Sequence, residues 1–247
     1  MMVLTRQNEY SREPHLVRFR KTRQGPEADL LDHLIAEQRW VRPGAPTRVL
    51  HLIEPQIGIG FPDLIVAVFD PKNIRHRNPR FELRDLKIIQ FLSSRLKPVR
   101  MTEAERKLGI PATKLRRRLA RLSRMGVVRL REEQVVYLND ERLFFLDQII
   151  AIEAKVKNWK IALHQAQMNQ IFASASYVML PEKIAMTVRE SFAAIGSPGL
   201  LAPSNGDIVC MKKASIYPLP QSVYSWMVNE MVRNAFTDMT KEESCHV

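Results

Sequence analysis

Almost all of the excess positive charge lies in one stretch of 51 residues, which constrains the organisation of this chain more than any other feature. Residues 81–131 contain 15 Lys and Arg but only 4 Asp and Glu, a net charge of +11. The whole chain of 247 residues has a net charge of +12, while residues 1–80 carry +4 and residues 132–247 carry −3. This asymmetry predicts a separate basic domain, for which a polyanion is the natural partner.

The composition is that of an ordinary globular protein, with 45% hydrophobic and 26% charged residues. No apolar run reaches the roughly 18 residues that cross a bilayer, and the amino terminus shows no apolar signal segment. Cys210 and Cys245 form neither a disulfide framework nor a metal knuckle, and the six histidines lack zinc-ligand spacing. We therefore expect a soluble, cytoplasmic protein that does not bind a membrane.

The basic stretch has the pattern of three helices followed by a β-hairpin. Apolar residues recur at helical spacing, Pro111 favours a helix start, and Gly126 favours a helix end. Thr102 and Glu105 are spaced as a capping box for the second helix. The expected helices are 81–96, 103–108 and 112–125, and the expected strands are 127–130 and 134–138.

This order of elements resembles a winged helix-turn-helix domain over residues 81–140. The resemblance implies that the third helix enters the major groove of double-stranded DNA. The cations that it would present are Lys114, Arg116, Arg117, Arg118, Arg121 and Arg124. A solvated basic face or a protein-docking surface is the alternative. DNA is favoured because phosphates relieve the repulsion among cations so closely spaced.

A carboxylate occupies the apolar side of the first expected helix, residues 27–40, which Pro26 begins. Glu27 lies four residues before Leu31 and seven before Leu34, so it shares the side that faces the core. A carboxylate there needs a partner or a metal ion. Equally, Glu27 fits a first-turn glutamate that the helix dipole stabilises, and the sequence leaves both interpretations open.

Two further acidic residues lie at the ends of expected buried strands. Pro62-Asp63 directly precedes the β-forming run 64–69, and Glu153-Ala154-Lys155 ends the apolar run 146–152. Alternation along a strand places Glu153 and Lys155 on one face. Such a pair can serve a metal-dependent site, in which the carboxylate binds a hard divalent cation and the lysine orients the attacking water or, as the neutral amine, deprotonates it.

Glu27, Pro62-Asp63 and Glu153-Ala154-Lys155 together resemble the PD-(D/E)xK nuclease superfamily. The resemblance implies a restriction-endonuclease-like α/β fold, in which helices flank a mixed central sheet. It also implies a DNA endonuclease that uses Mg²⁺, with Mn²⁺ as a substitute. Asp63 and Glu153 would bind the metal, Glu27 would reach it directly or through water, and Lys155 would help to place the attacking water.

The next helix carries a fifth candidate. Some branches of the superfamily have an active-site glutamine on the helix that follows the lysine. Gln165, ten residues after Lys155, matches the position of that glutamine. Those branches often have a tyrosine four residues later, where this chain has Asn169. A plain exposed glutamine is therefore the alternative for Gln165.

The spacing of the acidic residues predicts how the two patterns combine. Asp63 and Glu153 lie 90 residues apart, much further than the superfamily's usual hairpin, and removing residues 81–140 leaves roughly 30. We therefore expect residues 1–80 and 141–247 to form a discontinuous nuclease domain, which the winged helix-turn-helix domain interrupts.

A DNA-binding regulator without catalytic activity, built on a degenerate nuclease scaffold, is the alternative function. The presence of every catalytic residue type favours the enzyme. Cutting both DNA strands would suggest a homodimer or a partner subunit.

Overall fold

The fold was analysed in a computed structural model of the chain. It describes residues 2–4, 25–36, 47–58, 60, 62–74, 80–95, 97–138, 143–220 and 222–245. Residues 37–40 of the first expected helix and residue 96 of the second lie outside this described part.

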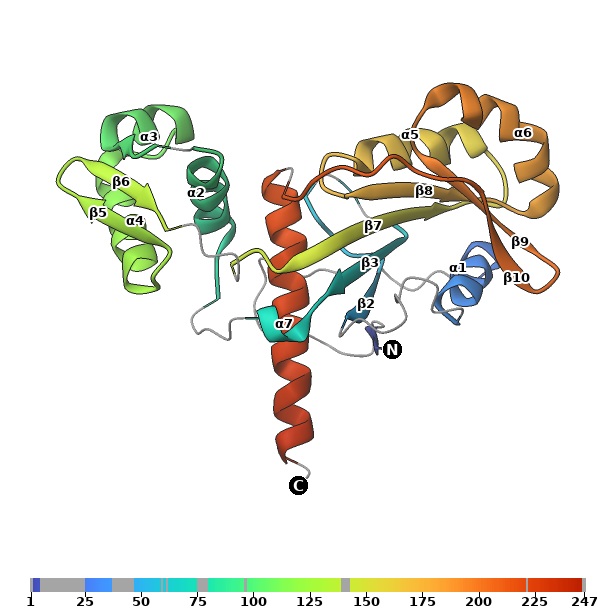
Figure 1. Ribbon diagram of the computed structural model, residues 1–247, viewed down its shortest axis with the longest axis horizontal. Helices are drawn as coiled ribbons and strands as arrows, with labels where there is room; N and C mark the ends of the chain where they lie inside the picture. Colours follow the sequence, from blue (N-terminus) through green and yellow to red (C-terminus); the bar gives the residue numbers. More distant parts are fainter. Residues whose placement is uncertain are drawn as a thin grey trace. The chain divides into compact units, whose positions relative to one another are not determined.

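The chain forms two compact units (Figure 1). The first comprises residues 1–72 and 146–232, and the second comprises residues 73–145 and 233–247. The long helix α7 (Val223–Cys245) begins in the first unit, and its residues from Arg233 onward belong to the second. The predicted limits of the insertion, 81–140, remain a prediction.

A mixed sheet forms the centre of the first unit. Its six longer strands have the order β2-β3-β7-β8-β9-β10, and the three-residue β1 (Met2–Leu4) lies parallel to β2 at the edge. Parallel pairing joins β7 to β8 and β8 to β9, whereas the other pairs of longer strands are antiparallel. The strands are β2 (Arg48–Ile53), β3 (Leu64–Phe69), β7 (Leu146–Ala154), β8 (Ala175–Met179), β9 (Gly199–Ser204) and β10 (Asp207–Lys212).

Helices cover both faces of this sheet. On one face, α1 (Pro26–Ala36) packs Leu31, Leu34 and Ile35 against β2, β3 and β7. On the other, α5 (Trp159–Asn169) and α6 (Glu182–Ile195) bury apolar side chains against β8 and β9. These two helices connect the parallel strands, as parallel pairing requires. Burial on both faces explains why β3 and residues 149–152 of β7 are continuous apolar runs.

In its described residues, the second unit contains three whole helices, the end of α7 and a small antiparallel sheet of order β4-β6-β5. The helices α2, α3 and α4 confirm the three expected ones within a few residues, and β5 and β6 confirm the hairpin. Their bounds are α2 (Leu83–Ser93), β4 (Val99–Arg100), α3 (Met101–Leu108), α4 (Ala112–Arg124), β5 (Val128–Arg131) and β6 (Gln134–Tyr137). A short 3₁₀ turn, Pro71–Asn73, follows β3.

The expected capping box at Thr102 is wrong. Helix α3 begins two residues before its expected start, at Met101, with Arg100 as its cap. Glu105 instead accepts a hydrogen bond from the backbone N–H of Ala112 at 3.0 Å, which places its side chain at the start of α4. Among the described helices, none is both long and apolar enough to cross a membrane.

Candidate functional site

The strand pairing of the first unit brings Asp63 and Glu153 together. Leu64 of β3 pairs with Ile152 of β7 in antiparallel register, so the preceding Asp63 lies opposite the following Glu153. Alternation along each strand directs these two side chains to the same face of the sheet. Two carboxylates that are 90 residues apart in the sequence therefore become neighbours, and both are almost fully buried.

Lys155 lies among three oxygen atoms at the same end of the sheet. Its Nζ is 3.1 Å from Asp63 Oδ2, 3.4 Å from Glu27 Oε2 and 3.0 Å from the carbonyl oxygen of Ala154. The backbone N–H of Lys155 donates to the carbonyl of Met179 on β8. Lys155 is therefore held in place both by its backbone N–H and by its terminal ammonium group.

Asp63 is fixed in turn by the backbone of β7. The N–H of Ala154 donates to Asp63 Oδ2 at 3.0 Å, and the same oxygen accepts from Lys155. Two such hydrogen bonds to one carboxylate oxygen leave the group little freedom to rotate.

Glu153 occupies an environment that opposes its charge. Burial, and next the negative charge of Asp63, raise the pKa of Glu153 to about 8. The hydrogen bond from Asn169 and the charge of Lys155 act in the opposite direction without cancelling the effect. Without a bound cation Glu153 is therefore mostly protonated at neutral pH, and it can share its proton with Asp63.

A divalent cation fits this carboxylate pair. Asn169 Nδ2 donates to Glu153 Oε1 at 2.7 Å, whereas the buried Glu153 Oε2 accepts no hydrogen bond from any described residue. Mg²⁺ commonly binds proteins through one or two carboxylates and keeps several waters as its other ligands. The unbonded Oε2, next to Asp63, is the kind of oxygen that such an ion requires.

Glu27 contributes to the site through Lys155. Its side chain, 28% exposed, lies on the first turn of α1 and forms an ion pair with Lys155. Within the described ranges, no three side chains of His, Cys, Asp or Glu are grouped as ligands of one metal ion. The sequence-based metal role of Glu27 thus remains a prediction, while its contact with Lys155 is observed.

Asn169, and not Gln165, makes the polar contact from α5 to the acidic pair. Gln165 lies one turn earlier, and its buried Oε1 has no hydrogen-bond partner among the described residues. The sequence carries a signal for Asn169, because it continues the apolar stripe of Ala162 and Ala166 at helical spacing. An amide on such a stripe requires a buried polar partner.

Glu54 is a further carboxylate that the sequence analysis did not single out. It directly follows β2, is buried, and donates its backbone N–H to the carbonyl of Asp63 at 3.0 Å. Its φ of 49° lies in the left-handed region, which is uncommon for a residue with a side chain. The sequence signal is weak, because Glu54 follows a short run, Arg48–Ile53, in which His51 interrupts the apolar residues.

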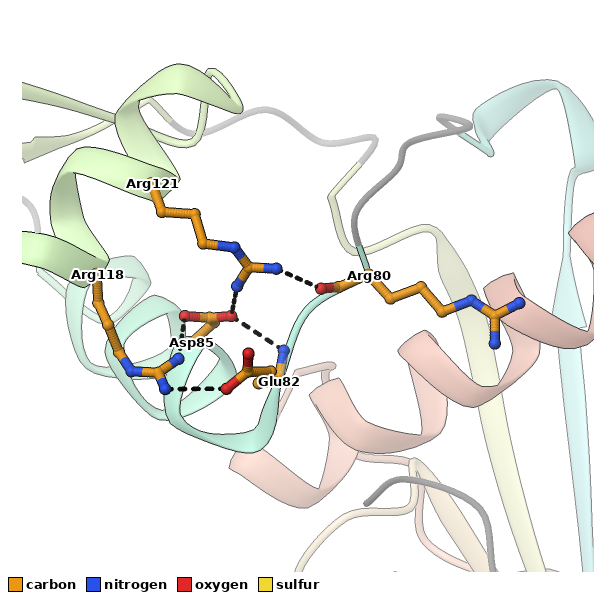
Figure 2. Close-up of polar contacts among 5 residues, drawn as sticks. All are labelled: Arg80, Glu82, Asp85, Arg118 and Arg121. Atoms are coloured by element: carbon orange, nitrogen blue, oxygen red, sulfur yellow. Dashed lines mark hydrogen bonds and ion pairs between the residues drawn. The ribbon is translucent and has the colours of Figure 1, made fainter. Parts of the chain in front are cut away.

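In the second unit, two of the six predicted DNA-binding cations form an ion-pair network around the buried Asp85 (Figure 2). Asp85 of α2 is fully buried and accepts hydrogen bonds from Arg118, at 3.0 Å, and from Arg121. Arg118 also binds Glu82 at 2.9 Å, and Arg121 donates to the carbonyl of Arg80 at 2.8 Å. The hydrogen bond from Arg118 lowers the pKa of the Glu82 carboxyl.

This network joins α4 to the start of α2. The backbone N–H of Glu82 donates to Asp85 Oδ2 at 3.0 Å, so Asp85 serves both the helix start and the two guanidinium groups. A buried carboxylate is strongly destabilising when it loses its partners. Arg118 and Arg121 therefore have a structural role, whatever else they contact.

The remaining cations of α4 are more exposed. Arg116 forms an ion pair with Glu133 of the hairpin turn at 3.0 Å, and both side chains are more than half exposed. The side chains of Lys114, Arg117 and Arg124 make no ion pair or hydrogen bond with another residue of the described part. Arg117 and Arg124 lie opposite the buried leucines of α4, on an exposed stripe with Thr113 and Ala120.

Comparison of the chain with protein-family models, with curated proteins and with solved structures gives no match.

Proposed function

We propose that this protein is a metal-dependent DNA endonuclease. The observation that carries the proposal is the meeting of Asp63, Glu153 and Lys155 at one end of the large sheet, although 90 residues separate the two carboxylates. A pair of carboxylates beside a fixed ammonium group suits the hydrolysis of a phosphodiester. The mixed sheet with helices on both faces is compatible with the restriction-endonuclease-like fold that the sequence suggested.

Asp63 and Glu153 would hold Mg²⁺, or Mn²⁺ in its place. When bound, the ion would supply Lewis-acid chemistry to a phosphate oxygen and lower the pKa of a bound water. Asp63 and Glu153 are largely closed to solvent, which strengthens their interaction with a cation.

Lys155 supplies the positive charge of the site. Its contacts with Asp63, Glu27 and the Ala154 carbonyl hold the ammonium beside the carboxylates. From there it can orient an attacking water or stabilise the charge that develops on a phosphate. Glu27 shares the task of positioning it, and Gln165 is retained as a catalytic candidate on the basis of its position alone.

The second unit would bind duplex DNA as a winged helix-turn-helix domain. Its three helices and the antiparallel hairpin that follows support this assignment. The exposed cations Lys114, Arg117 and Arg124 would contact DNA, with Arg116 contributing if DNA phosphates compete with Glu133 for it. Arg118 and Arg121 would instead stabilise the helix that presents these cations.

Plasmid cleavage tests the catalytic proposal. The wild-type protein should cut DNA with Mg²⁺ and stop when a chelator is added, and Asp63→Ala and Lys155→Ala should each lower the rate at least about a hundredfold. Asp207→Ala and Lys183→Ala, which remove exposed side chains of the same types from the first unit, should cut at the wild-type rate. Variants of Asp63 and Lys155 that cut as fast as the wild type would contradict the site. Tight DNA binding without cleavage under any divalent metal would favour the inactive regulator.

A further inference from the structure

The two oxygens of the Glu153 carboxylate are not equivalent in this structure. Oε1 accepts a hydrogen bond of 2.7 Å from Asn169, while Oε2 is buried and has no hydrogen-bond partner among the described residues. Glu153 is 2% exposed and Asn169 is 6% exposed, so water does not offer either group an easy alternative partner. The carboxylate is therefore held in one orientation by a side chain on α5.

We propose that Asn169 positions Glu153 to coordinate a metal ion through Oε2 alone, and that it thereby makes the site selective for small octahedral cations over Ca²⁺. Mg²⁺ requires a near-octahedral set of ligands, whereas Ca²⁺ accepts six to eight and often takes both oxygens of one carboxylate. Because the Asn169 amide already occupies Oε1, binding of a cation by both oxygens of Glu153 is disfavoured. This inference rests on the proposed metal site at Asp63 and Glu153.

The position of Asn169 on its helix supports this role. It ends the buried stripe of α5 that Ala162 and Ala166 begin, so packing against the sheet fixes where the amide points. Its backbone carbonyl also accepts the N–H groups of Phe172 and Ala173, which fixes the chain immediately after the helix. A side chain held this firmly can transmit its orientation to Glu153.

The test measures cation binding by the whole chain of 247 residues without DNA. Mn²⁺ is the probe, because it takes an octahedral set of oxygen ligands as Mg²⁺ does and free Mn²⁺ has an electron paramagnetic resonance signal. Ca²⁺ is then titrated in to displace it, and the ratio of the Mn²⁺ and Ca²⁺ affinities is compared between proteins. A proton on Glu153 competes equally with both cations. A change in the affinity ratio therefore reports a change in the geometry of the metal ligands, and not a change in the protonation of Glu153.

The variants are Asn169→Ala, which removes the amide, and Asn169→Leu, which removes it while filling most of its volume. Each should lower the Mn²⁺-to-Ca²⁺ affinity ratio at least about tenfold, the smaller end of what losing a group that orients a metal ligand causes. Gln167→Ala, on the exposed side of the same helix, is the matched control and should leave the ratio unchanged. Asp63→Ala should abolish Mn²⁺ binding, which shows that the probe reports on this site.

The possible failures are distinguishable. If the wild type binds Mn²⁺ and both Asn169 variants keep the wild-type ratio, the role of Asn169 is refuted while the proposed nuclease site stands. If the wild type binds no Mn²⁺, both the role of Asn169 and the proposed metal site are refuted. A purely structural role of Asn169 would lower the melting temperature of the variants without changing the affinity ratio. This result would also refute the inference.

Discussion

Replacing Glu153 with glutamine should make the first unit more stable at alkaline pH. The fold raises the pKa of Glu153 from 4.5 to about 8, chiefly through burial and the nearby charge of Asp63. The folded protein thus retains a proton that the unfolded chain releases. The resulting stabilisation is complete below pH 4.5 and is lost as the pH rises through about 8. Because one pKa unit corresponds to about 1.4 kcal/mol, the loss amounts to about 5 kcal/mol.

Glutamine carries no charge at any of these pH values, and its carbonyl can still accept the hydrogen bond from Asn169. The free energy of unfolding of Glu153→Gln, minus that of the wild type, should therefore rise from near zero at pH 4.5 to about 5 kcal/mol above pH 8.

Urea unfolding followed by tryptophan fluorescence, in the presence of a chelator, measures this difference. Trp159 and Trp226 belong to the first unit, and the sequence of the second contains no tryptophan. Glu190→Gln, on the exposed side of α6, is the control and should match the wild type at every pH. A Glu153→Gln difference that does not change with pH would refute the environment described for this carboxyl.

Three other predictions concern the metal and the basic helix. The affinity for Mn²⁺ should rise about tenfold for each pH unit up to about 8, because the ion must displace the proton of Glu153. Calorimetry measures this affinity, and an affinity that does not change with pH would contradict the prediction. Arg118→Ala should destabilise the second unit by about 1–3 kcal/mol, since Asp85 loses one guanidinium partner but keeps Arg121, and far-UV circular dichroism during urea unfolding measures the loss. Arg117→Ala with Arg124→Ala should leave that stability unchanged but weaken DNA binding, and the logarithmic salt dependence should become shallower by about two. An unaltered salt dependence would exclude the exposed stripe of α4 as the DNA contact.

The elements that surround the site could be predicted where one periodicity dominates. Strand β7 contains the apolar run 149–152 directly before Glu153, and α4 alternates leucines with cations at helical spacing, so both could be predicted. Strand β2 was not predicted, because Arg48–Ile53 is a short run in which His51 interrupts the apolar residues. The expected capping box failed because Glu105 has a partner at the start of the next helix, which local spacing does not reveal.

Partners that are distant in the sequence account for the remaining differences. Arg118 and Arg121 were indistinguishable from Arg117 in the sequence, because their carboxylate partner, Asp85, lies more than 30 residues earlier. Likewise, the contact between Asn169 and Glu153 depends on how α5 packs on the sheet. Helix and strand patterns reflect local preferences and burial, whereas these contacts depend on tertiary structure.

The most direct test of the central claim, that Asp63 and Glu153 form a metal site, is a crystal structure of the protein with Mn²⁺, located by its anomalous scattering. We predict one ion bound by an oxygen of Asp63 and by Glu153 Oε2, at about the 2.0–2.3 Å expected for small divalent cations with oxygen ligands. Lys155 should remain beside it. A saturated crystal that shows no ion between these two carboxylates would contradict the account.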